Sequence, residues 1–158
     1  MTTSLKRAGT VLLSVLLLCT LALSAGAASK LRVGVKFWKT GSDKESMANS
    51  GIDTSREASL TRQSNGTYTL TLPIQQVSKM GVTGYLTGLT IGDVTYDGTL
   101  TGDFNKATAV LTIKNLPASV LTGSDVNKSV LVTCNIQMDL QVLGEINTSA
   151  RMCIWNQK

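Results

Sequence analysis

The sequence predicts an all-β domain, an immunoglobulin-like antiparallel β-sandwich with one short helical turn. Three observations lead to this fold class. Apolar and polar residues alternate with a period of two over several short stretches, which is the pattern of strands with one face on a core and one in water. Turn-forming dipeptides separate these stretches, and no segment carries a long helical period. Roughly seven or eight short strands at this spacing suit a sandwich of immunoglobulin type.

Four stretches carry the clearest alternation. Residues 31–37 alternate Leu, Val, Val and Phe with Arg, Gly and Lys, and residues 68–72 place Tyr and Leu between threonines. Residues 107–113 alternate with a break at Val110, and residues 130–138 form the longest run. β-Branched threonines on the polar faces also favour strands. The side chains expected in the core are Val33, Val35, Leu70, Leu72, Leu111, Ile113, Val132, Ile136 and Ile154.

Turn signals set the expected connections. Asn65-Gly66 and Asp97-Gly98 are hairpin dipeptides, because Asn or Asp followed by Gly tolerates the positive φ of a tight turn. The helical turn is expected over residues 42–49, where Ser42 or Asp43 could cap the first turn and Glu45 lies within it.

Residues 1–27 have the three parts of a cleavable signal peptide. Lys6 and Arg7 form a basic start, residues 11–23 are almost all apolar, and Ala25 and Ala27 fit a small-residue cleavage site. The apolar run is shorter than the roughly 20 residues that a spanning helix needs. We therefore expect one domain over residues 30–158 that is secreted, with no membrane span after cleavage.

Charge argues against nucleic acid as a partner. The signal holds two of the 15 basic residues and none of the 10 acidic ones, so cleavage lowers the net charge from +5 to +3. Basic and acidic residues alternate along the rest of the chain, as on an ordinary solvated surface.

Two cysteines remain after cleavage, Cys134 and Cys153. In an exported chain they could form one disulfide, or they could be two buried free thiols. If the last two long strands pair as a hairpin centred near residue 143.5, the two cysteines face each other. Alternation argues against the bridge, because it places Cys134 on the inward face of its strand and Cys153 on the face opposite to Met152 and Ile154.

The residue inventory predicts that the protein is not an enzyme. The chain has no histidine, which excludes imidazole zinc sites and catalytic Ser-His-Asp or Cys-His groups. Asp93, Asp97 and Asp103 share a loop-rich stretch, but their spacing matches no calcium loop. Turn chemistry accounts for them better.

Four short motifs stand out along the mature chain. They are the strand end 35–39 (Val-Lys-Phe-Trp-Lys) followed by Ser46-Met47-Ala48-Asn49, the hairpin at Asn65-Gly66-Thr67-Tyr68, residues 80–86 and the closing residues 150–155. Together they resemble the NEAT domain, the near-iron-transporter module of Gram-positive bacteria. The likeness runs over almost the whole mature chain. It implies an immunoglobulin-like sandwich and a role in haem iron acquisition outside the cell.

The resemblance also implies a haem site between the short helical turn and the last hairpin. Ser46 and Lys39 would meet the propionates at the rim. Walls would come from both sides of the site, with haem as the cofactor: Met47, Met138, Val142, Leu143 and Ile146.

The last strand departs from the family pattern. Haem-binding members carry a Tyr-x-x-x-Tyr pair on this strand, whose first tyrosine ligates iron, whereas residues 144–149 here read Gly-Glu-Ile-Asn-Thr-Ser. Thioether sulfur is an accepted axial ligand, so Met47 or Met138 could replace the tyrosine. The alternative is a module that kept the fold without haem and binds a haem-carrying or other cell-surface protein.

Overall fold

The computed structural model describes residues 28–79, 81–139 and 144–158. The predicted signal peptide and two predicted wall residues, Val142 and Leu143, lie outside the described residues. These described residues form nine strands: β1 (Lys30–Trp38), β2 (Ala58–Arg62), β3 (Tyr68–Pro73), β4 (Val77–Lys79), β5 (Val82–Ile91), β6 (Val94–Thr101), β7 (Val110–Leu116), β8 (Val130–Met138) and β9 (Glu145–Asn156). The helical elements within these ranges are 3₁₀ turns: η2 (Met47–Gly51), η3 (Phe104–Lys106), η4 (Ala118–Val120) and η5 (Val126–Lys128).

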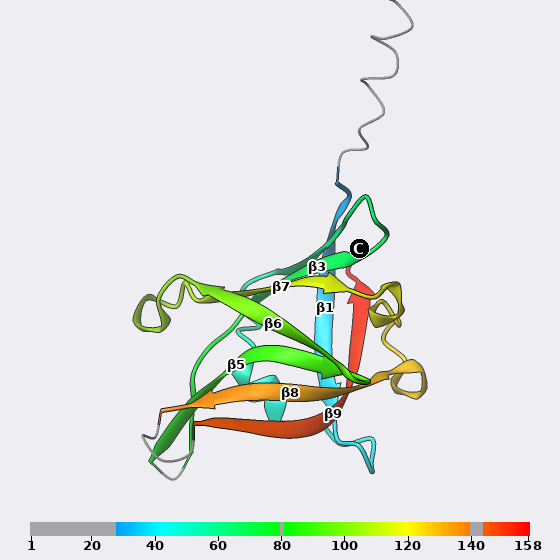
Figure 1. Cartoon of the computed structure of the whole chain (residues 1–158). Helices are drawn as coiled ribbons and strands as arrows, with labels where there is room; N and C mark the ends of the chain where they lie inside the picture. The colour runs from blue at the N-terminus through cyan, green and yellow to red at the C-terminus, as the bar shows by residue number, and fades with distance from the viewer. Residues whose placement is uncertain (1–27, 80, 140–143) are drawn as a thin grey trace, which may run out of the picture.

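The strands form one sheet that closes on itself. Its order is β4-β5-β6-β7-β3-β2-β1-β9-β8, and β5 also pairs with β8 (Figure 1). The pairings between these named strands are all antiparallel. The all-β prediction is therefore confirmed, but hydrogen bonding runs continuously around eight strands rather than within two separate sheets.

β5 is the strand that makes this closure possible. Its residues 84–90 pair with β8, while residues 88–91 pair with β6 on the other side. A β-bulge interrupts the β8 pairing between Leu86 and Gly88, and bulges bend a strand and increase its twist. Period-two alternation does not distinguish two facing sheets from one closed sheet, because both have one apolar face.

The core lies inside this closed sheet. Most of the expected core residues are buried, including Val33, Leu72, Leu111 and Ile154. Val35 and Ile136 are only partly buried, because each lines a pocket described below. The core also includes residues beyond those expected there, namely Leu60, Leu89, Ala109, Leu116, Val120, Ala150 and Met152.

Two predicted turns have different outcomes. Asn65-Gly66 does form the β2–β3 turn, where Gly66 has φ +84°. Asp97-Gly98 lies inside β6, and the β5–β6 turn falls instead at Gly92 and Asp93. Gly98 serves close packing here, since a Cβ would overlap Leu111 Cδ1 and lie 2.7 Å from the Thr87 carbonyl oxygen.

Two element boundaries also differ from prediction. The helical turn begins at Met47, and its cap is Ser46 rather than Ser42 or Asp43, because Glu45 forms a β-bridge with Trp38. The strand expected from residue 107 begins at Val110. Ala107 ends η3 with φ +51°, a left-handed conformation that no strand accommodates.

Of the two alternatives for the cysteines, the structure has the free thiols: Cys134 and Cys153 are both unbridged and buried. The β8–β9 pairing places Cys134 opposite Thr148, so the hairpin centres on residue 141 rather than 143.5. Cys153 lies five residues further along β9, about 17 Å at strand rise, whereas a bridge needs Cα atoms within about 7 Å. Cys153 instead packs under the η5 segment, with Sγ 3.6 Å from the Asp125 carbonyl oxygen.

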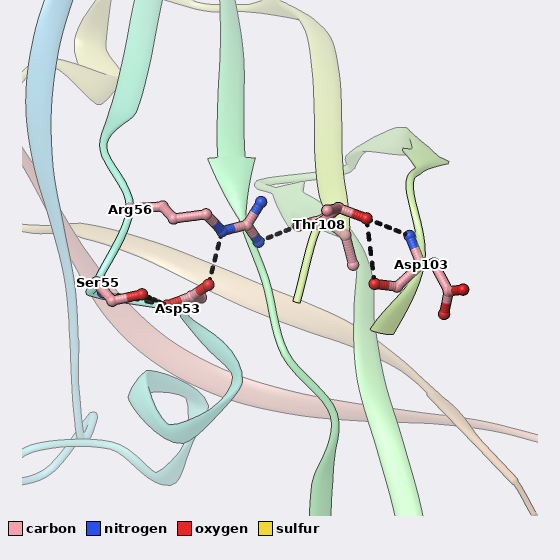
Figure 2. A network of polar contacts seen from close by, with 6 residues as sticks. Asp53, Ser55, Arg56, Asp103 and Thr108 are labelled. Atoms are coloured by element: carbon pink, nitrogen blue, oxygen red, sulfur yellow. Dashed lines mark hydrogen bonds and ion pairs between the residues drawn. The ribbon is translucent and has the colours of Figure 1, made fainter. Parts of the chain in front are cut away.

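A partly buried ion pair fixes the chain after η2. Asp53 accepts hydrogen bonds from the Ser55 hydroxyl at 2.6 Å and from Arg56 Nε at 2.6 Å. Arg56 Nη2 donates to the Ala109 carbonyl oxygen at 2.6 Å, beside the Thr108 hydrogen bonds of the β6–β7 connection (Figure 2). The cluster thereby ties the segment that leads out of η2 to the start of β7.

Because of this cluster, the stability of the folded state depends on pH in the acid range. Hydrogen bonds from Ser55 and Arg56 hold the pKa of Asp53 below its usual value of 3.8. Because the folded state favours the carboxylate, the stabilisation is complete above pH 3.8 and is lost as the pH falls below it. We expect Asp53→Asn to lower Tm near neutral pH, with a difference from wild type that shrinks on acidification, as measured by circular dichroism melts.

The control is Asp93→Asn in the exposed β5–β6 turn. Its Tm should follow the wild-type curve at every pH. A Tm difference for Asp53→Asn that stays constant down to the lowest pH would contradict the assigned ionisation.

Candidate functional site

An apolar pocket of about 290 Å³ opens at one end of the closed sheet. The η2 turn forms one side of it, through Ser46, Met47, Ala48 and Gly51. The inner faces of three paired strands form the opposite side. These strands and the segment around them contribute Val77, Val82, Gly84, Tyr85, Leu86, Ile136, Met138, Ile146 and Thr148.

The η2 turn is anchored to β1 by one side chain. Asn49 accepts a hydrogen bond from the Phe37 backbone N–H at 2.8 Å and returns one from Nδ2 to the Phe37 carbonyl at 2.7 Å. Its amide therefore pairs with the strand as a neighbouring backbone would. The Ser46 hydroxyl accepts from the Ala48 N–H at 3.3 Å and caps the turn. Both contacts hold Ser46 and Met47 at the pocket.

The pairing of β8 with β5 and β9 brings together the side chains on the opposite side of the pocket. Gly84 lies opposite Met138 and Leu86 opposite Ile136, while Ile136 also faces Ile146 on β9. Because alternate side chains share a face, Ile136 and Met138 continue the inward row that begins with buried Cys134. The pocket is thus the open end of the core rather than a surface depression.

The structure brings together four of the predicted site residues. Ser46 and Met47 on the turn lie across the pocket from Met138 and Ile146. Lys39 does not line the pocket; it is exposed, and its carbonyl accepts a hydrogen bond from Arg151 Nε at 3.1 Å.

The sequence did not indicate the pocket residues that come from β5 and from the segment before it. Val77, Val82 and Leu86 come from the segment that precedes and begins β5, and only long-range pairing with β8 brings them to the site. Gly84 was missed as well, although it lies within a motif that carried the family resemblance. No local pattern in the sequence signals which strands become neighbours.

Tyr85 lines the pocket but its ring faces elsewhere. Alternation along β5 turns the ring away from the side that Gly84 and Leu86 share. It packs against Phe104 with ring centroids 5.0 Å apart. Cys134 lies deeper in the inward row, where burial raises the pKa of its thiol to about 12, so the sulfur stays protonated and is a poor metal ligand.

A second pocket of about 380 Å³ is lined by β1 and by the segment from Glu45 to Ala58. Its charged side chains are already paired: Lys36 with Glu45 at 2.5 Å, Arg56 with Asp53 at 2.6 Å, and Glu57 with Arg32 at 2.8 Å. An apolar pocket with few polar groups is the more usual ligand site. The pocket at η2 is therefore the better candidate.

The described residues offer neither a preformed metal cluster nor a membrane helix. They contain no group of three or more His, Cys, Asp or Glu side chains arranged to hold a metal ion. No helix in the same ranges is long and apolar enough to cross a membrane.

Fold and site together define a small all-β domain, with a closed antiparallel sheet and an apolar pocket at its end. The sequence itself matches no family model and no curated protein. The fold is similar to the NEAT5 domain of IsdX2, a haemophore of B. anthracis solved in complex with haem. That likeness has a TM-score of 0.53 at 10% identity and covers 84% of this chain and 99% of that one.

A mutant of the same IsdX2 domain, also solved with haem, gives the same TM-score of 0.53 and 10% identity, with 84% and 98% of the two chains covered. The chain therefore has a NEAT-like fold, as the sequence motifs predicted. At this identity the likeness establishes the fold, and the function has to be argued from the pocket.

Proposed function

We propose that this protein is a NEAT-like haem-binding module. In this proposal residues 1–27 direct its export from a Gram-positive cell, and the domain works outside the cell in the acquisition of haem iron. The observation that carries the proposal is the apolar pocket between η2 and the β8–β9 hairpin. The comparison domain with this fold was solved with haem, which supports the same ligand here.

The residues present fit a haem macrocycle. Leu86, Ile136 and Ile146 offer an apolar wall, and a flat apolar ring gains affinity mainly by leaving water. A volume of about 290 Å³ is just below the roughly 300–1,000 Å³ of ligand pockets. The pocket would therefore enclose one edge of the ring, while Ser46 at the rim could donate a hydrogen bond to a propionate.

A second candidate function is a protein-interaction module with the same fold. Two observations favour it: β9 carries no tyrosine, and apolar Met47 and Ile146 are 57% and 38% exposed at the pocket mouth. Exposed apolar residues around a pocket also suit a protein contact. A haem-carrying or other cell-surface protein would then be the partner.

A haemin titration of the purified protein tests the first proposal. We expect a shifted Soret band with haemin or with dithionite-reduced haem. Ile146→Glu should weaken binding at least about tenfold, which is about 1.4 kcal/mol, because a carboxylate at the apolar wall loses hydration when the ring enters.

The matched control is Leu131→Glu. Leu131 is 63% exposed on the neighbouring strand β8, and its parity with Thr133 places it on the outer face. Its haem affinity should equal that of the wild type. Without any Soret shift in either oxidation state, the haem proposal fails and the protein-interaction function replaces it.

A further inference from the structure

We infer that Met138 supplies the axial sulfur ligand in this pocket. Gly84, which has no side chain, leaves the space that the Met138 sulfur occupies. The site consequently binds ferrous haem more tightly than ferric haem. This inference rests on the proposed haem-binding function. It chooses between the two methionines that line the pocket, and it assigns Gly84 a role beyond backbone geometry.

The contact between Gly84 and Met138 is the first observation. The two residues are cross-strand partners. A Cβ at position 84 would lie 2.7 Å from Met138 Sδ, 3.1 Å from the Gln137 carbonyl oxygen and 3.3 Å from Ile136 Cγ2. Real Cβ atoms do not approach sulfur this closely. The sulfur therefore rests on the glycine, and any other residue there would displace it.

The backbone that carries Met138 is also fixed. Its N–H donates to the Gly144 carbonyl at 2.9 Å, and the next residue, Asp139, donates its N–H to the Thr83 carbonyl at 2.7 Å. Met138 is partly buried. A ligand held this way loses little freedom when it binds a metal. Met47, by contrast, is 57% exposed on a turn of five residues.

The other donor atoms around the pocket are poorer ligands. The chain has no histidine. The Ser46 hydroxyl already accepts a hydrogen bond from Ala48, and neutral alcohols such as Ser46 and Thr148 bind iron weakly. The Tyr85 ring packs against Phe104, with ring centroids 5.0 Å apart, and the variant Tyr85→Phe below tests it as a ligand. Thioether sulfur is the donor that remains on the wall.

Sulfur ligation has a consequence for the oxidation state. A neutral, polarisable thioether favours Fe(II), whereas an anionic tyrosinate favours Fe(III). The apolar walls strengthen this preference, because ferric haem carries an extra positive charge that the walls do not solvate on the side facing them. Tighter binding of the ferrous form necessarily raises the reduction potential of the bound haem by the same free energy.

The experiment compares wild type with Met138→Leu, which keeps an apolar side chain of similar size. X-ray absorption and magnetic circular dichroism of the haem complexes report sulfur in the iron coordination shell, and a redox titration reports the potential. We expect Met138→Leu to lose the sulfur signal and at least a tenfold preference for ferrous haem, a shift of about 59 mV for one electron. Metal-free protoporphyrin IX should bind both proteins equally.

Three further variants separate the alternatives. Gly84→Ala should weaken the sulfur signal in the same direction as Met138→Leu, because the new Cβ displaces Sδ. Met47→Leu and Tyr85→Phe should keep it. A sulfur signal lost in Met47→Leu, or a tyrosinate charge-transfer band lost in Tyr85→Phe, would overturn the assignment to Met138.

The two proposals fail in different ways. If the wild type binds haem but shows no sulfur in the coordination shell, or binds ferric haem as tightly as ferrous haem, the inference falls and haem binding stands. If neither haem nor protoporphyrin IX binds, both fall. Should Gly84→Ala not fold, the comparison of wild type with Met138→Leu decides the question alone.

Discussion

Replacing Leu111 by alanine is expected to lower the free energy of unfolding by about 3–4 kcal/mol. Leu111 is 1% exposed near the start of β7, with Leu72 and Leu100 as its cross-strand partners. Truncation removes apolar burial and leaves a cavity, since the neighbours are held by strand pairing and relax little. Urea denaturation with a shared m-value measures the loss.

Thr112→Ala is the matched control for this prediction. Thr112 is the next residue on the same strand and points to the outer face, between Thr71 and Thr99. Its loss should stay below about 1 kcal/mol, as for most surface substitutions. Equal losses at the two positions would show that the inward and outward faces of β7 are assigned wrongly.

Gly102→Ala is expected to lower the free energy of unfolding by about 3 kcal/mol, through two effects. Gly102 has φ +81°, and a left-handed conformation costs a residue with a Cβ about 1–2 kcal/mol. The new Cβ would also overlap the Thr108 carbonyl oxygen. Backbone must then move in the β6–β7 connection, and such overpacking adds about 1–3 kcal/mol.

Gly66→Ala isolates the conformational part of this loss. Gly66 has a similar φ of +84°, but a Cβ added there would meet no atom within 4 Å. Chemical denaturation should give a loss of about 1–2 kcal/mol for Gly66→Ala and a clearly larger one for Gly102→Ala. Similar losses would mean that the β6–β7 connection adjusts to the new side chain without strain.

The turns show how far local sequence information reaches. Asn65-Gly66 and Asp97-Gly98 look alike as dipeptides, yet one forms a turn and the other continues β6. A Cβ on Gly66 would meet open space, whereas Gly98 lies under Leu111 and the Thr87 carbonyl. One glycine is needed for its positive φ, and the other is needed because a side chain would not fit. The dipeptide sequence is alike in both cases, so only the neighbouring strands distinguish them.

The candidate site shows the same division. The motifs of the turn and the last hairpin predicted Ser46, Met47, Met138 and Ile146, and the structure brings these residues to one pocket. Lys39 is expected at the rim, against a propionate; it is not among the residues that line the pocket, and the Trp38–Glu45 bridge closes the loop that carries it. Gly84 and Leu86 were missed because they reach the pocket only through the β5–β8 pairing.

The sequence by itself determined the all-β class, most of the strands and the inward side chains, because alternation depends only on which neighbours along one strand avoid water. Tertiary structure decided three other features: the closure of the sheet, the separation of Cys134 from Cys153, and the close contact of the Met138 sulfur with Gly84. Each depends on register between strands distant in sequence, and a shift of one residue moves every side chain to the other face.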